Sequence, residues 1–186
     1  MGERRLIPSL PSVCYRVARA GHSRTAAEAL SGFGGLVIDG RWHSVGRPIV
    51  YASANPSLCF IERVAHGDEW LHQTHHDRVL LTLALPRLSF AAVTASDLDA
   101  DEPRWRDGDN PFCRRLGDEW LRRQVTCALL VPSAVVPQDT NLLFNPAHPD
   151  FRALVALNAN LVSQPVTVDP RLGSIVSLGA AAAASR

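Results

Sequence analysis

Residues 40–53 read Gly-Arg-Trp-His-Ser-Val-Gly-Arg-Pro-Ile-Val-Tyr-Ala-Ser, and this stretch decides how the rest of the chain is interpreted. It carries Arg41 and Tyr51, and the helix expected after it carries Glu62. Arginine offers a planar fork of donors that matches a pyrophosphate. A tyrosine ring stacks on a heteroaromatic base, and a carboxylate beside a sugar stabilises an oxocarbenium-like transition state. The three side chains therefore fit chemistry on a phosphorylated sugar.

The same region predicts a strand followed by a helix. Residues 48–53 read as a strand, and Asn55-Pro56 is a typical helix start, with Asn as the cap and Pro in the first turn. Four apolar residues define the expected buried stripe of this helix: Leu58, Ile61, Val64 and Ala65. Glu62 lies one residue off that stripe, so we expect it at the boundary between core and solvent, on the wall of a cleft.

Apolar periodicity predicts the other elements. Strands are expected at 13–18, around Val37, and at 78–85, 126–131 and 152–157, helices at 25–30 and 111–124, and a polar surface loop at 97–110. The strand at 78–85 is apolar enough to be covered on both faces. The pattern is that of an α+β fold: a single domain of short mixed strands with about three helices. An Ala-rich tail is expected at 176–186.

Composition narrows the class of protein. The chain has 186 residues, 46% of them hydrophobic and 20% charged, which predicts one soluble domain. A net charge of +1 gives no excess of positive charge that would indicate direct binding to nucleic acid or to an anionic membrane. We find no signal peptide and no apolar run of membrane-spanning length, so we expect a cytoplasmic protein. Four cysteines at unrelated spacings predict reduced, buried thiols: Cys14, Cys59, Cys113 and Cys127.

A histidine cluster at His66, His72, His75 and His76 raises the question of a metal site. His72 and His76 have helical i, i+4 spacing, but the residue after His72 is Gln73 rather than Glu, so the zinc motif His-Glu-x-x-His is absent. We interpret the cluster as a solvated loop and predict no metal.

Five motifs in order resemble the RES-domain family, toxins of bacterial toxin–antitoxin pairs. They are Val13-Cys14-Tyr15-Arg16-Val17, Gly40-Arg41-Trp42, the strand Pro48 to Ser53 with its following helix Ser57 to Glu62, the segment Leu130 to Pro137, and Asn145 to Pro149. The resemblance spans about 14–172, within a RES domain set at 1–175. His43-Ser44 stands where the family more often has Asn, a departure that could change substrate or rate.

The resemblance implies an ADP-ribosyltransferase (diphtheria-toxin-like) fold and an enzyme that breaks the bond between nicotinamide and ribose in NAD⁺. It implies catalytic roles for Arg41 (at the pyrophosphate), Tyr51 (at nicotinamide or its ribose) and Glu62 (at the ribose hydroxyls and the developing cation). Residues expected to complete the NAD-binding pocket are Arg16, Gly40, Trp42, Ser133 and Asn145. NAD⁺ is then a substrate, and no resident cofactor is expected.

Three nucleophiles remain open. Water would make the protein an NAD glycohydrolase, and a protein side chain would make it an ADP-ribosyltransferase. Inorganic phosphate, which a mycobacterial member of the family implies, would make it an NAD⁺ phosphorylase, and we favour that reading. The expected partner is an Xre-like antitoxin that blocks the NAD cleft. A non-catalytic module that binds a nucleotide or a protein is the alternative of another class.

Each candidate also has an ordinary structural interpretation. Arg41 could be a surface arginine in a turn, Tyr51 a core tyrosine, and Glu62 a solvated helix charge. Ser133 follows Pro132, where serine often caps a turn, and Asn145 precedes Pro146, where asparagine forms turns.

The charge balance generates a prediction about DNA. Because binding to duplex DNA is dominated by contacts to phosphate, a chain with a net charge of +1 should not shift a DNA duplex in a gel at physiological salt. The same assay with a co-purified partner is the comparison. A tight shift by this protein alone would contradict the prediction.

Overall fold

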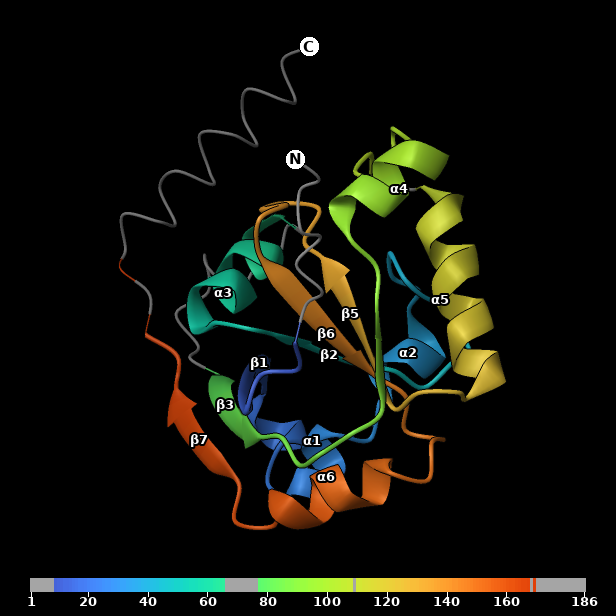
Figure 1. Cartoon of the computed structure of the whole chain (residues 1–186). Helices are drawn as coiled ribbons and strands as arrows, with labels where there is room; N and C mark the ends of the chain where they lie inside the picture. The colour runs from blue at the N-terminus through green and yellow to red at the C-terminus, as the bar shows by residue number, and fades with distance from the viewer. Residues whose placement is uncertain (1–8, 66–76, 109, 168, 170–186) are drawn as a thin grey trace.

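A mixed sheet forms the centre of the computed structural model, which describes residues 9–65, 77–108, 110–167 and 169. Its seven strands in this described part are β1 (Val13–Arg19), β2 (Val50–Ser53), β3 (Arg78–Ala84), β4 (Phe90–Ala92), β5 (Ala128–Pro132), β6 (Thr140–Phe144) and β7 (Val162–Pro165). They lie in the order β4-β5-β6-β2-β1-β3-β7 (Figure 1). Among these pairs only β4–β5 is parallel. The predicted α+β class is confirmed.

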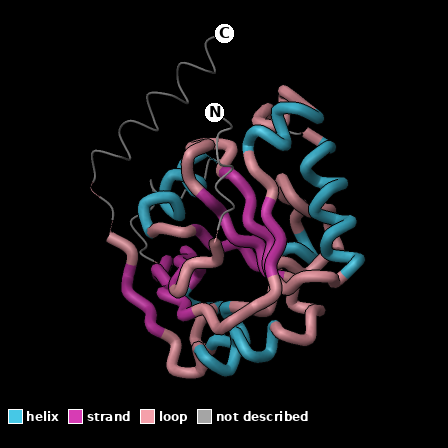
Figure 2. The backbone as a smooth tube through the Cα atoms, viewed as in Figure 1, coloured by secondary structure: helices cyan, strands magenta, loops and turns pink. Residues whose placement is uncertain are grey.

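Helices surround this sheet, as Figure 2 shows by colour. They are η1 (Ala20–His22), α1 (Ala26–Ala29), α2 (Gly34–Val37), α3 (Pro56–Ala65), α4 (Ala95–Asp101), α5 (Pro111–Arg123) and α6 (Phe151–Leu157). The three helices expected from sequence are present, and a side chain caps the first turn of each. Thr25 Oγ1 accepts from the Glu28 amide, and Asn55 Oδ1 from the Leu58 amide. Asn110 Oδ1 accepts from the Phe112 amide, directly before α5.

Two apolar segments expected as strands are helices instead. The strand around Val37 was wrong: Gly34–Val37 is a helical turn in which a Cβ on Gly35 would lie 2.2 Å from the Arg47 carbonyl oxygen. The strand at 152–157 was also wrong, because Phe151 and Leu154 are buried at helical spacing in α6. Short apolar runs do not distinguish a strand from a buried helix until a neighbouring surface is known.

The prediction of a loop at 97–110 was wrong for residues 97–101, which belong to helix α4. Thr94 and Asp97 form a capping box: the threonine hydroxyl accepts from the Asp97 amide, and the aspartate accepts from the Thr94 amide. This arrangement satisfies two amides that a helix start otherwise leaves without partners. Helix α4 therefore begins at Ala95, and only residues after Asp101 form a loop.

The two faces of the sheet carry separate cores, because neighbouring residues of a strand point to opposite faces. On β6, Leu142 and Phe144 belong to the core that includes Leu154 of α6, whereas Leu143 belongs to the core below α4 and α5. Trp105 is at the centre of the second core and is fully buried. Both cores cover β5, which explains why its sequence is apolar throughout.

The buried stripe of α3 differs from the predicted one. Leu58 and Cys59 are its buried residues, while Ile61 is 41% exposed. Cys59 packs with Val17 of β1. The helix is therefore rotated about its axis relative to the expectation, and Glu62, which follows Leu58 by four residues, comes to the inner edge of the helix.

Strands β1 and β2 are joined by a very short ladder. Tyr15 lies opposite Ser53, and the described ladder between these strands has this one pair. Arg16 then bridges the strands with its side chain, because its Nη1 donates to the Tyr51 carbonyl oxygen at 2.7 Å. The sheet thus opens between β1 and β2, and this opening positions the site.

The four cysteines are buried and free, as predicted. Within the described ranges, no helix combines the length and apolar character needed to cross a membrane. The histidine cluster at 66–76 and the tail at 176–186 lie outside the described residues.

Close contact between α5 and the loop before β2 generates a stability prediction. A Cβ on Gly117 would lie 2.0 Å from the Trp42 carbonyl oxygen, so Gly117→Ala should lower the free energy of unfolding by about 1–3 kcal/mol despite the better helix propensity of Ala. Chemical denaturation measures this change. Gly21→Ala, where a Cβ meets no atom within 4 Å, is the matched control and should be near neutral. Equal stabilities of the two variants would contradict the packing argument.

Candidate functional site

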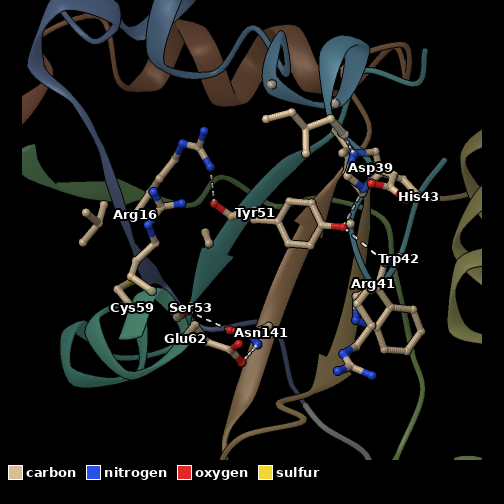
Figure 3. Close-up of a pocket in the computed structure, with 18 of the residues that line it drawn as sticks. Arg16, Asp39, Arg41, Trp42, His43, Tyr51, Ser53, Cys59, Glu62 and Asn141 are labelled. Atoms are coloured by element: carbon tan, nitrogen blue, oxygen red, sulfur yellow. Dashed lines mark hydrogen bonds between the residues drawn. The ribbon is translucent and has the colours of Figure 1, made fainter. Parts of the chain in front are cut away.

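A pocket of about 800 Å³ lies at the opening between β1 and β2. Side chains reach it from β1, from the loop after α2, from β2, from α3 and from β6, as Figure 3 shows for its labelled residues. Arg41, Tyr51 and Glu62, predicted as catalytic residues, all line it. Of the residues predicted to bind substrate, Arg16, Gly40 and Trp42 line it as well.

Glu62 is held by a chain of hydrogen bonds that begins on β2. Ser53 Oγ donates to Asn141 Oδ1 at 2.7 Å, and Asn141 Nδ2 donates to Glu62 Oε1 at 2.5 Å. Ser53 and Asn141 are register partners on β2 and β6. The sheet therefore fixes the amide that orients the carboxylate (Figure 3).

Tyr51 crosses the centre of the pocket, with Arg16 on one side of it and Arg41 on the other (Figure 3). Its hydroxyl lies 2.8 Å from His43 Nδ1 and accepts from the Trp42 amide at 3.3 Å. Burial raises the pKa of Tyr51 well above its ordinary value, so the phenol is neutral. The ring remains available for stacking on a planar ligand.

Arg41 holds the loop that follows α4. Its Nη1 donates to the carbonyl oxygens of Trp105 and Asp107 at 2.6 and 3.2 Å. Its Nη2 donates to the Arg106 carbonyl oxygen at 3.2 Å. These bonds use three of the five guanidinium N–H groups, so contacts within the described residues leave donors on Nε and Nη2 for a ligand. Arg41 is thus a clamp between two loops as well as a pocket residue.

Arg16 is fixed by the strand pair rather than by a carboxylate. One of its terminal nitrogens is bonded to the Tyr51 carbonyl oxygen, and its Nε has no hydrogen-bond partner among the described residues. Burial lowers the pKa of Arg16 from its ordinary value, although the guanidinium stays protonated at neutral pH. A buried, incompletely satisfied arginine favours an anionic ligand.

The lining as a whole is cationic. Its arginines are Arg16, Arg19, Arg41, Arg63 and Arg78, and its carboxylates are Asp39, Glu62 and Asp77. Burial, followed by the repulsion of Arg78 and two further arginines, lowers the pKa of Arg63 to about 10. Like charges brought this close indicate a site for an anion, and this is the electrostatic property that a phosphate-containing ligand requires.

Gly40 and Trp42 form the wall beside Tyr51. A Cβ on Gly40 would lie 2.9 Å from the Tyr51 hydroxyl oxygen, so the close approach requires glycine. Trp42 is 3% exposed and packs in the core below α5, and its role at the pocket is mainly to fix the backbone.

Ser133 and Asn145 do not reach the pocket lining. Ser133 Oγ accepts from the amides of Val135 and Val136, which is the turn-capping role of a serine at a strand end. Asn145 donates to the Leu121 carbonyl oxygen and accepts from the Ala147 amide. Both are fully or almost fully buried, so their hydrogen bonds serve the fold, and the expectation that they bind substrate is not supported by their position.

Sequence reasoning missed Ser53 and Asn141 as site residues, and it noted His43 only as a departure from the family pattern. Ser53 was within reach, because it follows Tyr51 by two residues on a strand and so shares its face. Asn141 gave no local signal, since it reaches Glu62 through the register of β6 with β2. Cys59 also lines the pocket, but its thiol donates to the Tyr15 carbonyl oxygen and burial raises its pKa, so it is no nucleophile.

The protein thus combines an α+β fold with an arginine-rich pocket in which a carboxylate is held by a hydrogen bond. Residues 13–169 match the family model of the RES domain, and the chain belongs to the RES-domain family. A relative named "Toxin Res" from Pseudomonas putida is 36% identical over 143 residues, 77% of this chain and 92% of that protein. A second, named "Prs ADP-ribosylating toxin", from Sphingobium sp., is 36% identical over 131 residues, 70% of this chain and 80% of that protein.

A solved structure shares the fold. The toxin–antitoxin complex MbcT–MbcA of M. tuberculosis contains a chain that superposes with a TM-score of 0.63 at 20% identity, over 89% of this chain and 88% of that chain. The fold is thus the ADP-ribosyltransferase-like fold that the sequence resemblance implied.

The clamp at Arg41 generates a prediction on stability. Arg41→Lys keeps the charge but cannot reach three carbonyl oxygens at once, so the free energy of unfolding should fall by about 1–3 kcal/mol. Arg47→Lys is the matched control, because Arg47 makes a partly exposed ion pair with Asp118, and it should cost less than about 1 kcal/mol. Denaturant titration of both variants decides the matter, and equal losses would refute the clamp.

Proposed function

We propose that this protein is the toxin of a toxin–antitoxin pair and that it degrades NAD⁺ by breaking the bond between nicotinamide and C1′ of its ribose. The observation that carries the proposal is the Glu62 carboxylate, held by Asn141 beside the Tyr51 ring in a pocket lined by arginines. The names of the RES relatives, which include a toxin described as ADP-ribosylating, support the same class of reaction.

The chemistry asks little of the protein apart from orientation and charge. The C1′–N bond breaks with its electron pair going to nicotinamide, which therefore leaves as a neutral molecule. Positive character develops at C1′ and its ring oxygen, and a carboxylate at this place stabilises it more in the transition state than in the ground state. Glu62 fills this role in the proposal, with its orientation fixed by the Asn141 amide.

Arginines lie on both sides of Tyr51, with Arg41 on one side and Arg16 on the other (Figure 3). In the proposal each side binds a different anion. On one side, Arg41 offers its remaining Nε and Nη2 donors to the pyrophosphate. On the other, Arg16 lies near a further group of pocket arginines: Arg19, Arg63 and Arg78. We propose inorganic phosphate as the nucleophile on this side, because Arg16 Nε has no hydrogen-bond partner among the described residues; the protein would then be an NAD⁺ phosphorylase.

A second reading is a protein ADP-ribosyltransferase, in which a side chain of a target protein attacks C1′. The relative named "Prs ADP-ribosylating toxin" is the observation that favours it. The same pocket serves both reactions, because they share every step up to the arrival of the nucleophile.

A cognate antitoxin completes the proposal. An enzyme that drains the cytoplasmic NAD⁺ pool must be restrained, and the solved relative of the same fold is described as a toxin–antitoxin complex. We propose an Xre-like antitoxin that covers the NAD cleft and supplies the contacts to DNA.

The decisive measurement is release of free nicotinamide from NAD⁺ by the purified protein, with and without inorganic phosphate. Glu62→Gln keeps the shape of the side chain but removes its charge, so kcat should fall by at least about 100-fold. Glu119→Gln, on the exposed face of α5, is the matched control and should keep the native rate. A Glu62→Gln variant with native kinetics would remove the proposed catalytic role.

The second product identifies the nucleophile. ADP-ribose 1″-phosphate, formed only with phosphate present, supports the phosphorylase. Free ADP-ribose at the same rate without phosphate shows a glycohydrolase, and label transferred from NAD⁺ to a protein shows a transferase. No nicotinamide under any of these conditions would overturn the proposal in favour of a binding module.

A further inference from the structure

The tautomer of His43 follows from its two neighbours. His43 is 4% exposed, and its Nε2 lies 3.1 Å from the Ile38 carbonyl oxygen. A carbonyl oxygen only accepts hydrogen bonds, so Nε2 carries the proton. A neutral imidazole has one N–H group, and Nδ1 is therefore an acceptor. The hydroxyl of Tyr51, 2.8 Å away, must then donate its proton to Nδ1.

This bond decides what Tyr51 presents to the pocket. Its single proton points away from the pocket toward His43, and its oxygen already accepts from the Trp42 amide at 3.3 Å. One lone pair of the oxygen remains. A ligand next to the Tyr51 hydroxyl therefore meets an acceptor and no donor.

The packing around this pair is tight enough to hold it. A Cβ on Gly40 would lie 2.8 Å from His43 Cε1 and 2.9 Å from the Tyr51 hydroxyl oxygen, and a Cβ on Gly35 would lie 3.0 Å from His43 Cδ2. The imidazole and phenol rings are tilted by 56° with centroids 5.5 Å apart. The absence of a Cβ at these two glycines thus makes room for the His43 ring beside the Tyr51 hydroxyl.

The charges around His43 come from the loop before it and from α5. Burial lowers the pKa of His43 most strongly, and Arg114 of α5 lowers it further. The Ile38 carbonyl, Asp118 of α5 and Asp39 act in the opposite direction. The net direction is down, so His43 is neutral at neutral pH, in agreement with the geometry.

We propose that His43 is a positioning residue that makes the Tyr51 hydroxyl an obligatory hydrogen-bond acceptor, and that the ligand group bound there carries an N–H or O–H donor. The inference rests on the proposed function for the identity of that group: the carboxamide of nicotinamide or a ribose hydroxyl has the required donor. A ligand that offers only acceptor atoms at this place is rejected, because it leaves two oxygens facing each other without a proton between them.

Protonation of His43 reverses the polarity. With protons on both ring nitrogens, Nδ1 donates to the Tyr51 oxygen. The phenol keeps its proton, but its O–H group then points toward the pocket as a donor. Since the pKa of His43 is lowered, the acceptor form persists through neutral pH and is lost only as the pH falls below the ordinary histidine range. Affinity for the donor-bearing ligand should fall in the same window.

The first test needs no substrate. Imidazole ¹⁵N chemical shifts of the full chain report which ring nitrogen carries the proton, and His43→Asn assigns the signal by its loss. We expect the Nε2–H tautomer at neutral pH and a titration below the ordinary histidine range. An Nδ1–H tautomer, or an ordinary titration, would overturn the inference. Since no NAD⁺ is present, this result is independent of the proposed function.

The second test uses NAD⁺ as the probe and compares variants. His43→Asn keeps an acceptor for the Tyr51 hydroxyl but does not titrate, so its KM should stay within about threefold of the native value. His43→Leu offers no acceptor and should raise KM about tenfold with a smaller change in kcat, as expected for the loss of one hydrogen bond. His22→Asn, at an exposed histidine, is the matched control.

A double-mutant cycle separates positioning from general support of the fold. In a Tyr51→Phe background the hydroxyl is absent, so His43→Leu should change KM by no more than about twofold. The ratio of native to His43→Asn kcat/KM should fall at acid pH, because titrations shared by both proteins cancel. A full tenfold effect of His43→Leu in the Tyr51→Phe background, or a ratio independent of pH, would show a merely structural role. If the ¹⁵N result holds but no variant releases nicotinamide, the proposed function fails and the tautomer assignment stands.

Discussion

The pocket depends on the way β1 and β2 separate. The strands pair at Tyr15 and Ser53, and beyond this point the backbone bonds of the ladder are replaced by the Arg16 side chain on the Tyr51 carbonyl oxygen. A continuous ladder would bring the two backbones together and close the space. Since the sheet opens here, Tyr51, Glu62 and the arginines line one pocket although they come from different elements.

The loop before β2 is rigid for reasons that lie outside the pocket. The amide and hydroxyl of Ser44 donate to the two carboxylate oxygens of Asp118 on α5, and Arg47 pairs with the same aspartate. Gly117, next to Asp118, lets the helix touch the Trp42 carbonyl. Helix α5 is thus the support on which Arg41 and His43 are held, and a site built this way loses little entropy when it binds a ligand.

His43-Ser44, the departure from the family pattern, takes part in this arrangement at two points. Ser44 fastens the loop to α5, and His43 directs the Tyr51 hydroxyl. An Asn at position 43 could accept from the same hydroxyl, but it would not titrate. The difference between the two residues is therefore one of pH dependence more than of shape.

The sequence by itself determined those features of this protein that depend on contacts between residues close together along the chain. The caps at Thr25 and Asn55 were predictable, because a cap bond joins residues three positions apart, and so was the strand that carries Tyr51. The grouping of Arg41, Tyr51 and Glu62 on the pocket lining followed from the resemblance of the motifs to the RES-domain family, since the local stretch alone left Glu62 as a solvated helix charge.

Only the tertiary structure decided the rest. Ser53 reaches Asn141 across 88 residues and Asn141 reaches Glu62 across 79, so strand register, which no local pattern encodes, places the partner of the carboxylate. The apolar runs at 34–37 and 151–157 became helices because the surfaces they meet bury residues at helical spacing. Likewise, Arg41 became a clamp because the loop after α4 presents three carbonyl oxygens to it, and Ser133 and Asn145 were drawn to backbone partners away from the pocket.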